Sequence, residues 1–450
     1  MSNQETLSKT PNEMAMRVSF EEQATVLLSQ LERFRKTGLI TRCGLEVEYG
    51  LIERSDWNQC PQKKRDDIIA RTGGYADVEL GAAQIEIRTE PFCLEDGGSE
   101  VLLDQLESRD ATINQHAQDL NLYLISHGTN PFVATRGIER TALSKYVLVP
   151  NHHNNYQRSQ DTFVGNGQKI DIGDAAIIGI TNSVQANIEA ADAGDAVDMV
   201  NRSFAIGPMA VSFFANARFL EGKDTGIQDI RMIAWEISHD TRNEDDLKAG
   251  NITRVGLPGC YYDSLNGYFD HILKYPFILD APEAAMAVGI GLNWQDSRIK
   301  VIGDSLVAEF RPVSTQATPQ LNFCAMMFYV GRLLWAKDHQ EQLLPMIKVQ
   351  QNRNEAMYFG SQAKLWTNVG IGIKRIPAGE AKVIEVKRAE EALASRGILT
   401  KICKDALSLL HKMTKSGSEV LAEKRETFVG QGADDRCALF TALEKTGGIR

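Results

Sequence analysis

The amino-acid sequence predicts an α+β fold in which strands from distant parts of the chain pair with one another. Apolar and polar residues alternate in four short stretches, at residues 46–48, 84–88, 185–187 and 309–311. Side chains of a strand point alternately to its two faces, so each stretch has one apolar face and one charged or amide face. Segments with helical periodicity separate these stretches, and the sequence contains no internal repeat. This order is typical of an α+β domain.

The first predicted element is an amphipathic helix at residues 19–37, where apolar residues recur at three- and four-residue steps. A strand is predicted over 42–53, a polar loop over 54–72, a strand over 78–89, a helix over 101–121 and a strand over 122–126. Farther along, the patterns predict a polar loop over 150–169, a strand over 180–188, helices over 193–219, 231–238 and 318–337, and a hairpin formed by 298–301 and 306–311. Helical periodicity dominates from residue 381 onward.

Length and composition predict a globular protein with helical ends. A chain of 450 residues that is 43% hydrophobic and 24% charged is long enough for two or three domains. We expect an N-terminal helical segment at residues 1–40, a catalytic domain at 41–375 and a C-terminal helical extension at 376–450. The net charge of −10 argues against a nucleic-acid partner, because proteins that bind polyanions are usually basic.

Neither a membrane span nor a disulfide framework is expected. The longest apolar runs, at residues 204–214 and 324–334, are shorter than the roughly 18 residues that cross a bilayer, and they predict buried core helices. The polar N-terminus, residues 1–18, does not resemble a secretory signal. Seven cysteines, an odd number without C-x-x-C spacing, argue against disulfides and structural zinc. These observations predict a cytoplasmic protein.

The polar faces of the alternating stretches carry many carboxylates. Glu46 and Glu48 share a face with no cation between them. Two like charges about 4 Å apart repel by about 1 kcal/mol in water and by roughly 4 kcal/mol at an effective dielectric constant of 20. A cluster of acidic residues would therefore require cations, and Mg²⁺ or Mn²⁺ prefers such oxygen ligands. The candidate ligands are Glu46, Glu48, Glu79, Glu86 and Glu309. For any one stretch, a solvent-exposed sheet face is the alternative interpretation.

Glu79 and Glu86 are seven residues apart, and in a regular strand this odd spacing places them on opposite faces. Gly81 lies between them, and a bulge or bend there would bring both to one side. Gln185 and Asn187 lie on the polar face of a strand whose other face is apolar. Amide oxygens are weak Mg²⁺ ligands, and simple hydrogen bonding is the alternative.

Basic residues accompany the acidic ones. Arg298 and Lys300 share a face of the predicted hairpin, as do Glu309 and Arg311, and Arg231 opens the predicted helix at 231–238. Arginine suits carboxylate or phosphate recognition and lysine suits phosphate, with salt bridges to the glutamates as the alternative. The sequence has no P-loop or Rossmann glycine pattern, so metals and arginines would have to hold any nucleotide.

The polar loop predicted at residues 150–169 is long enough to act as a lid over a site. His152 and His153 lie in this segment and invite a transition-metal interpretation. Two adjacent histidines in a loop point in different directions, so a position on the surface is favoured.

Several ordered motifs together resemble the glutamate–cysteine ligase type 2 family of carboxylate–amine ligases, over about residues 40–370. The segments that carry the resemblance are 44–49, 78–81 leading to 86–89, 182–187, 215–223 continuing to Trp235, and 296–300 followed by 309–311. The resemblance implies a glutamine-synthetase-like fold, in which a curved and mainly antiparallel sheet forms a funnel-shaped site with helices packed outside. Asn187 replaces the family's usual second metal-strand residue, and the segments at 150–169 and beyond 380 do not match.

The resemblance also implies an ATP- and Mg-dependent ligase that forms a γ-glutamyl amide through an acyl-phosphate, most simply from L-glutamate and L-cysteine as in glutathione biosynthesis. Arg231 is then expected to bind the amino-acid substrate, and Arg298, Lys300 and Arg311 to contact the nucleotide. Glu309 and Arg311 are the expected catalytic residues. The implied metal ligands are Glu46, Glu48, Glu79, Glu86, Gln185 and Glu309.

Three alternatives remain open at the level of sequence. The ligase can join glutamate or another carboxylate to a different amine. The protein can be a guanidino or carboxylate kinase on a related fold, which would release a stable phosphorylated product. It can also be a non-catalytic relative that binds metal or nucleotide. The expected partners are small molecules, and an oligomer is compatible with the sequence.

Overall fold

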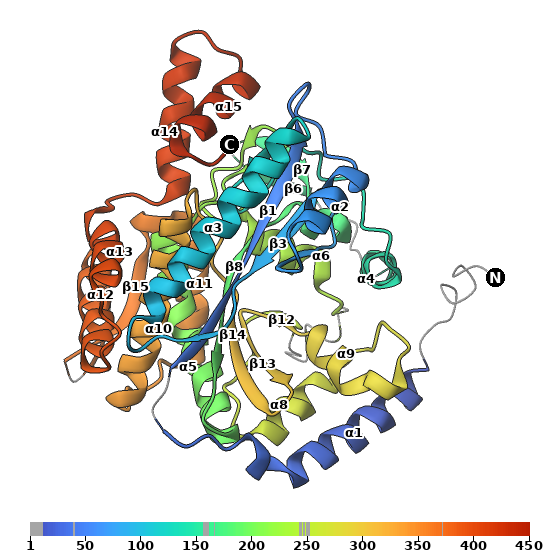
Figure 1. Ribbon diagram of the computed structural model, residues 1–450, viewed down its shortest axis with the longest axis vertical. Helices are drawn as coiled ribbons and strands as arrows, with labels where there is room; N and C mark the ends of the chain where they lie inside the picture. Colours follow the sequence, from blue (N-terminus) through green and yellow to red (C-terminus); the bar gives the residue numbers. More distant parts are fainter. Residues whose placement is uncertain are drawn as a thin grey trace.

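In the computed structural model, the chain forms an α+β fold around one eight-stranded, curved antiparallel sheet (Figure 1). The structure describes residues 12–38, 41–155, 162–165, 167–242, 245, 248, 253–370 and 372–450. Six strands follow the order β13-β14-β8-β1-β3-β2, and β4 and β5 also pair with β1. Their bounds are β1 Arg42–Glu53, β2 Ala76–Val78, β3 Gln84–Arg88, β4 Phe92–Cys93, β5 Leu122–Ile125, β8 Val184–Glu189, β13 Ser297–Ile302 and β14 Ser305–Phe310. The predicted fold class, a mainly antiparallel sheet with helices outside, is confirmed.

The register of the sheet collects polar side chains on one face. Residues directly opposite each other in an antiparallel pair point to the same side. Glu46 lies opposite Gln185, and Glu48 lies opposite Glu86. The same relation joins Glu46 to Arg88, Asn187 to Glu309 and Arg298 to Glu309. Segments that are more than two hundred residues apart in sequence therefore contribute to a single polar surface.

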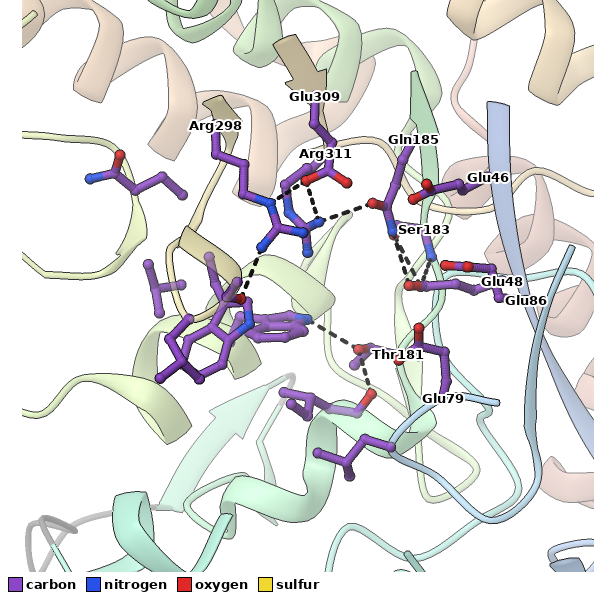
Figure 2. A pocket seen from close by; sticks show the side chains of 18 of the residues that line it. Glu46, Glu48, Glu79, Glu86, Thr181, Ser183, Gln185, Arg298, Glu309 and Arg311 are labelled. Carbon is purple, nitrogen blue, oxygen red and sulfur yellow. Dashed lines mark hydrogen bonds and ion pairs between the residues drawn. The ribbon is translucent and has the colours of Figure 1, made fainter. Parts of the chain in front are cut away.

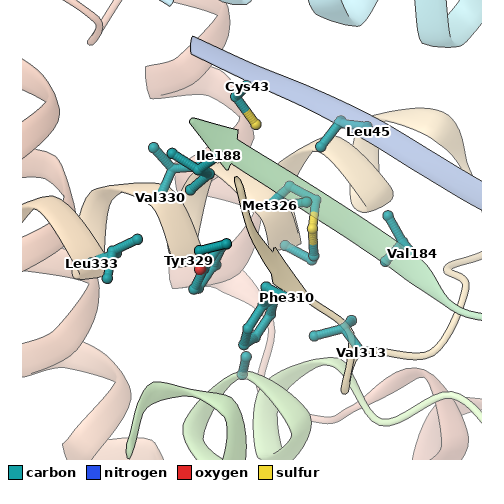
Figure 3. Close-up of a cluster of buried hydrophobic side chains, with 14 of the residues drawn as sticks. Cys43, Leu45, Val184, Ile188, Phe310, Val313, Met326, Tyr329, Val330 and Leu333 are labelled. Carbon is teal, nitrogen blue, oxygen red and sulfur yellow. The ribbon is translucent and has the colours of Figure 1, made fainter. Parts of the chain in front are cut away.

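The opposite face of the sheet is apolar and packs on two long helices, α5 (Ala193–Phe214) and α10 (Pro319–Asp338) (Figure 3). Phe310 of β14 stacks on Tyr329 of α10 with ring centroids 3.7 Å apart. The helix α10 begins at the N-cap Thr318, whose side chain accepts a hydrogen bond from the Leu321 amide. The predicted core helices are confirmed, because most side chains of both apolar runs are buried.

The remaining helices surround this core. Their bounds are α1 Glu13–Ser29, α2 Gln62–Arg71, α3 Gly98–Asp119, α4 Ser144–Asn154, α6 Ile230–His239, α8 Leu265–Ile272, α9 Ala285–Gly291, α11 Met346–Phe359, α12 Ala378–Ser395, α13 Lys401–Lys412, α14 Gly417–Gly430 and α15 Asp435–Thr446. Helix α1 packs on α8 and α9, with Phe20 against Phe269 and Phe277. Helices α14 and α15 stand together at one end of the molecule (Figure 1).

Short strands and 3₁₀ turns complete the fold. They are η2 Leu31–Phe34, η3 Ala175–Ile180, η4 Pro282–Ala284, η5 Gly360–Gln362, β6 Thr162–Gly165, β7 Gln168–Asp171, β9 Phe219–Leu220, β10 Lys223–Asp224, β11 Val255–Gly256, β12 Trp294–Gln295, β15 Lys364–Val369 and β16 Gly372–Pro377. No helix among the described residues is both long and apolar enough to cross a membrane. The sequence patterns did not predict the hairpin β15–β16 or the helices α8, α9 and α11.

The prediction of an uninterrupted loop at residues 54–72 is wrong, because its second half forms helix α2. Charged side chains hid the helical pattern, and α2 buries only Arg65 and Ile68. The prediction of one strand at 78–89 is also wrong. A turn separates β2 from β3, and the two strands form an antiparallel hairpin.

The segment predicted as a loop at 150–169 begins inside helix α4 and continues as the hairpin β6–β7. Residues 156–161 and 166 lie outside the described residues, so the structure describes only part of the expected lid at 150–169. The surface position predicted for His153 is wrong, since its side chain is buried in α4.

Candidate active site

A pocket of about 440 Å³ opens over the polar face of the sheet. The structure brings all the candidate site residues named from the sequence to its lining: Glu46, Glu48, Glu79, Glu86, Gln185, Arg231, Arg298, Lys300, Glu309 and Arg311. Their charges are not mixed evenly. Carboxylates without a close cation lie on one side, and a carboxylate surrounded by cations lies on the other (Figure 2).

Glu48, Glu79 and Glu86 form the acidic trio. One carboxylate oxygen from each lies within 4.8 Å of the others, and none of the three makes a salt bridge to any residue that the structure describes. Hydrogen bonds fix the Glu48 carboxylate: the Ser183 amide donates to it at 2.6 Å and the Ser183 hydroxyl at 3.0 Å. The Gln185 amide nitrogen also donates to Glu48, at 3.0 Å.

The acidic trio is electrostatically strained. Burial and the neighbouring charge of Glu48 raise the pKa of Glu79 to about 8. Burial and the negative charge of Glu46 raise the pKa of Glu86 well above its usual value. Burial also raises the pKa of Glu48, although Arg311 and the hydrogen bonds of Ser183 oppose the shift. Removal from water and like charge both disfavour ionised carboxylates, and the charge of a bound divalent cation would offset these penalties.

The turn between β2 and β3 places Glu79 and Glu86 on the same side. Asp77 lies opposite Glu86 in the hairpin, so Glu79, two residues later, points to the same face. Gly81 in this turn lies against Gly179 of η3, where a Cβ on Gly81 would meet the Gly179 carbonyl oxygen at 2.0 Å. The predicted convergence is therefore present, but a chain reversal produces it and a bulge does not.

The sequence patterns missed Arg65 of α2, which holds this turn. Its Nη1 donates to the carbonyl of Gln84 at 3.0 Å, to that of Gly81 at 3.3 Å and to the Thr141 hydroxyl at 3.1 Å. The Arg65 side chain is completely buried. A buried arginine bonded to both ends of a turn fixes its geometry. In the sequence, the single indication that Arg65 is buried was its position three and four residues before Ile68 and Ile69 in a highly charged segment.

Glu309 has the opposite surroundings. Its side chain is fully buried and forms ion pairs with Arg298, Lys300 and Arg311. We call these three cationic residues the basic triad. The Arg311 Nη1 atom lies 2.8 Å from a Glu309 oxygen. The three cations lower the pKa of Glu309 well below its usual value and overcome the effect of burial. Glu309 is therefore ionised, and cations already occupy its oxygens.

Glu46 and Gln185 lie between the acidic trio and the basic triad. Lys300 Nζ donates to Glu46 at 3.2 Å and to Asn187 at 3.1 Å. The Gln185 carbonyl oxygen accepts from Arg311 at 2.9 Å, while its amide nitrogen faces Glu48. Gln185 thus joins the two charged regions through its two ends.

Arg231 lies at the start of α6 and is 6% exposed. Its Nε donates to the Ser314 hydroxyl at 3.2 Å, and Ser314 in turn donates to Asp229 at 2.7 Å. Its Nη2 donates to the Pro312 carbonyl at 2.5 Å. Nη1 makes no hydrogen bond to any residue that the structure describes, so one edge of the guanidinium remains available to the pocket.

Two further lining residues, Asp296 and Arg353, were not predicted from the sequence. Arg353 of α11 binds Asp296 through two hydrogen bonds of 2.7 and 3.1 Å and also pairs with Glu236 of α6. This buried network joins α11 and α6 to the beginning of β13. A single arginine on a helix leaves no alternating pattern in the sequence, so only the folded structure reveals that Arg353 lines the pocket.

The residues present fit a divalent cation at the acidic trio. Three carboxylates offer oxygens close to one another, and no basic side chain among the described residues forms a salt bridge with them. Hard cations such as Mg²⁺ prefer such oxygen donors. Glu46 and Glu309 already pair with cationic side chains, and the Gln185 carbonyl oxygen accepts from Arg311, so the oxygens of these three residues already have partners.

Solved structures share this fold. The glutamate–cysteine ligase from Francisella tularensis, solved in complex with AMP, matches with a TM-score of 0.60 over 92% of this chain and 89% of that chain at 10% sequence identity. A bifunctional glutathione synthetase from Pasteurella multocida matches with a TM-score of 0.56 at 9% identity, over 95% of this chain and 54% of that chain. The fold is thus that of the glutamate–cysteine ligases.

The sequence comparison identifies the family. The profile of glutamate-cysteine ligase family 2 (GCS2) matches residues 42–425, and the chain belongs to that family. The glutamate–cysteine ligase EgtA of Mycolicibacterium smegmatis is 26% identical over 57% of this chain and 55% of the relative. The chloroplastic glutamate–cysteine ligase of Nicotiana tabacum is 25% identical over 51% of this chain and 39% of the relative. The chain thus spans about half the length of these curated relatives, or less. The family resemblance recognised from the motifs is confirmed.

Proposed function

We propose that this protein is an ATP- and Mg²⁺-dependent carboxylate–amine ligase that joins the side-chain carboxylate of L-glutamate to an amine. The observation that carries the proposal is the acidic trio lying beside the basic triad in one pocket of a glutamate-cysteine ligase family 2 chain. The names of the relatives support glutamate as the donor and an amino acid as the acceptor. The AMP bound by the Francisella tularensis enzyme supports an adenine nucleotide.

In this proposal, Glu48, Glu79 and Glu86 would hold the magnesium, and Glu46, Gln185 and Glu309 are the further candidate ligands that the family resemblance implies. Bound Mg²⁺ would neutralise phosphate charge and orient the phosphates for transfer. Arg298, Lys300 and Arg311 can stabilise negative charge on the phosphoryl group, because they converge on one point from three side chains. Arg231 offers its free guanidinium edge to a substrate carboxylate.

The proposed reaction has two steps. A donor carboxylate oxygen bonds to the γ-phosphorus of ATP, and ADP leaves. The amine nitrogen then bonds to the carbonyl carbon of the acyl-phosphate, inorganic phosphate leaves, and the amine releases a proton. The chain contributes orientation and charge stabilisation to both steps. Walls that exclude water also protect the acyl-phosphate from hydrolysis.

The test is ADP release by the full chain with ATP, Mg²⁺ and L-glutamate, with and without a panel of amines, together with mass analysis of the product. We expect ADP release that requires an amine and yields an amide in equal amount. Accumulation of a stable phosphorylated product without any amine would identify a kinase and overturn the proposal. Absence of turnover together with saturable Mg²⁺ or ATP binding would identify a non-catalytic relative.

Glu86→Gln and Glu309→Gln test the residue roles. Glu90→Gln is the matched control, because Glu90 is exposed and lies two residues after β3, the strand that carries Glu86. Each of the two pocket variants should lower turnover by about 10³-fold, which corresponds to about 4 kcal/mol of barrier. The control should keep turnover within about twofold. Turnover like that of the wild type in either pocket variant would refute the assigned role.

A further inference from the structure

One side of the pocket is apolar and takes no part in the charge clusters. Its residues come from α4, α6, the segments before, within and after α9, and β12. We call the following six the aromatic wall: Val149, Trp235, Leu279, Val288, Leu292 and Trp294. A surface for nucleotide phosphates, metal and glutamate alone would not need these side chains, because all three of those ligands are charged.

The aromatic wall is held rigidly from behind. The rings of Trp235 and Trp294 lie 5.9 Å apart, and the buried His239 ring packs against them at 5.0 and 5.1 Å. His153 packs on His239 at 4.3 Å and on Trp294 at 5.4 Å. Burial lowers the pKa of His239 to about 3, so this ring packs as a neutral group. A preformed wall loses little conformational entropy when a ligand binds.

The aromatic wall lies close to the acidic trio. The Trp235 indole nitrogen donates to the Thr181 hydroxyl at 3.1 Å. Two residues farther along, Ser183 binds Glu48 through its amide at 2.6 Å, and both Thr181 and Ser183 line the pocket (Figure 2). A group that rests on Trp235 is therefore near the proposed magnesium site.

Helix α6 presents Arg231 and Trp235 on one face, because residues four apart in a helix lie about 5–6 Å apart on the same side. The free Nη1 edge of Arg231 can bind a carboxylate at one end of this face, while Trp235 receives an apolar group at the other. Both groups line the same pocket, as the binding of the carboxylate and the side chain of one amino acid requires.

We infer that the amine substrate is an α-amino acid with a bulky apolar or aromatic side chain, bound by its carboxylate to Arg231 and by its side chain to the aromatic wall. This inference rests on the proposed ligase function and specifies its acceptor. A cysteine side chain, with one carbon and one sulfur, would cover only a small part of the wall. An adenine ring is the alternative occupant of the aromatic wall, and the KM for ATP in the variants below distinguishes the two.

The experiment compares L-phenylalanine, L-leucine, L-cysteine and glycine as acceptors for the full chain with ATP, Mg²⁺ and L-glutamate. We expect kcat/KM for phenylalanine or leucine to exceed that for glycine by at least about 30-fold, as the burial of a large apolar side chain predicts. Cysteine or glycine used as efficiently as both apolar amino acids would overturn the inference and leave the proposed ligase function intact.

Trp235→Ala should lower kcat/KM for the preferred apolar acceptor by about 30-fold relative to kcat/KM for glycine in the same variant, while the KM for ATP stays within about threefold of the wild type. Ile237→Ala on the same helix is the matched control, because Ile237 is 40% exposed and does not line the pocket. Val288→Trp fills the wall without leaving a cavity, and it should exclude apolar acceptors but spare glycine. A higher KM for ATP in Trp235→Ala, with acceptor use unchanged, would assign the wall to the base and overturn the inference.

Binding separates this inference from the proposed function if no amine supports turnover. L-Leucine and glycine would then be titrated into the full chain by isothermal titration calorimetry, because Trp235→Ala removes the indole that a fluorescence signal would report. Saturable leucine binding that is lost in Trp235→Ala, but kept in Ile237→Ala, would support the apolar subsite although the ligase proposal had failed. Equal responses to leucine and glycine would overturn both.

Discussion

Glu309 and the acidic trio lie in the same pocket and consist of the same type of residue, yet their surroundings shift their pKa values in opposite directions. Three cations lower the pKa of Glu309, whereas burial and like charge raise the pKa of Glu79 and Glu86. The comparison shows that one part of the pocket is electrostatically complete within the protein. The other part has no ion-pair partner among the described residues, and this difference is the basis for the proposed metal site.

The largest effect on stability is expected at Glu309. Glu309→Gln leaves Arg298, Lys300 and Arg311 around a neutral amide, and loss of one partner of a buried ion pair costs about 3–5 kcal/mol. Urea unfolding of the metal-free protein should show this loss, while Glu90→Gln should stay within about 0.5 kcal/mol of the wild type. A Glu309→Gln protein as stable as the control would show that the three cations do not depend on Glu309.

The same substitution in the acidic trio should have the opposite sign. Glu79→Gln removes one of three crowded carboxylates, so the metal-free protein should become more stable by about 1.4 kcal/mol or more, which is the equivalent of one pKa unit. Urea unfolding at about pH 8, with chelator present, measures this change. A destabilised Glu79→Gln protein would contradict the proposed strain and would favour a structural role for the Glu79 carboxylate.

The third prediction concerns pH. The folded pKa of Glu79, about 8, is raised above the unfolded value near 4.5, so its contribution to stability is present at low pH and is lost as pH rises toward 8. The pKa of the buried His239 is lowered to about 3, so the contribution of such histidines to the stability of the protein is lost only as pH falls below about 6.5. Between about pH 7 and 8, the pH dependence of the unfolding free energy therefore reflects the acidic trio and not these histidines.

We expect the metal-free protein to lose up to about 1.4 kcal/mol of stability per pH unit for each such carboxylate in this range. Saturating Mg²⁺, or the Glu79→Gln substitution, should flatten the dependence. The measurement is the free energy of unfolding at several pH values, with chelator and with Mg²⁺. An equal slope under all three conditions would show that another group titrates.

The smallest effect is expected from Arg298→Lys, which keeps the charge beside Glu309. Arg298 Nη1 also donates to the carbonyls of Gly291 at 2.9 Å and Asn293 at 3.2 Å, and a lysine cannot reproduce this geometry. Loss of these hydrogen bonds should cost about 1 kcal/mol in urea unfolding. A cost as large as that of Glu309→Gln would mean that hydrogen-bond geometry, and not charge, holds the basic triad.

Much of this pocket was predictable from local sequence. Alternation alone placed Glu46 with Glu48, Gln185 with Asn187 and Arg298 with Lys300 on shared faces, and the register of the sheet bears this out. The roles assigned to these residues remain predictions. The errors fell where tertiary contacts override local pattern. Arg65 holds a turn from an otherwise charged helix, and His153 packs on Trp294 and His239 despite its polar neighbours.

By itself, the sequence determined which side chains share a strand face and that the protein carries more carboxylates there than a solvated sheet requires. Such alternation is local, since it follows from the two-residue repeat of an extended backbone. Only the tertiary structure decided which of those carboxylates meet cations. That outcome depends on distances between strands that are far apart in the chain, and Coulomb energies change with those distances and with burial.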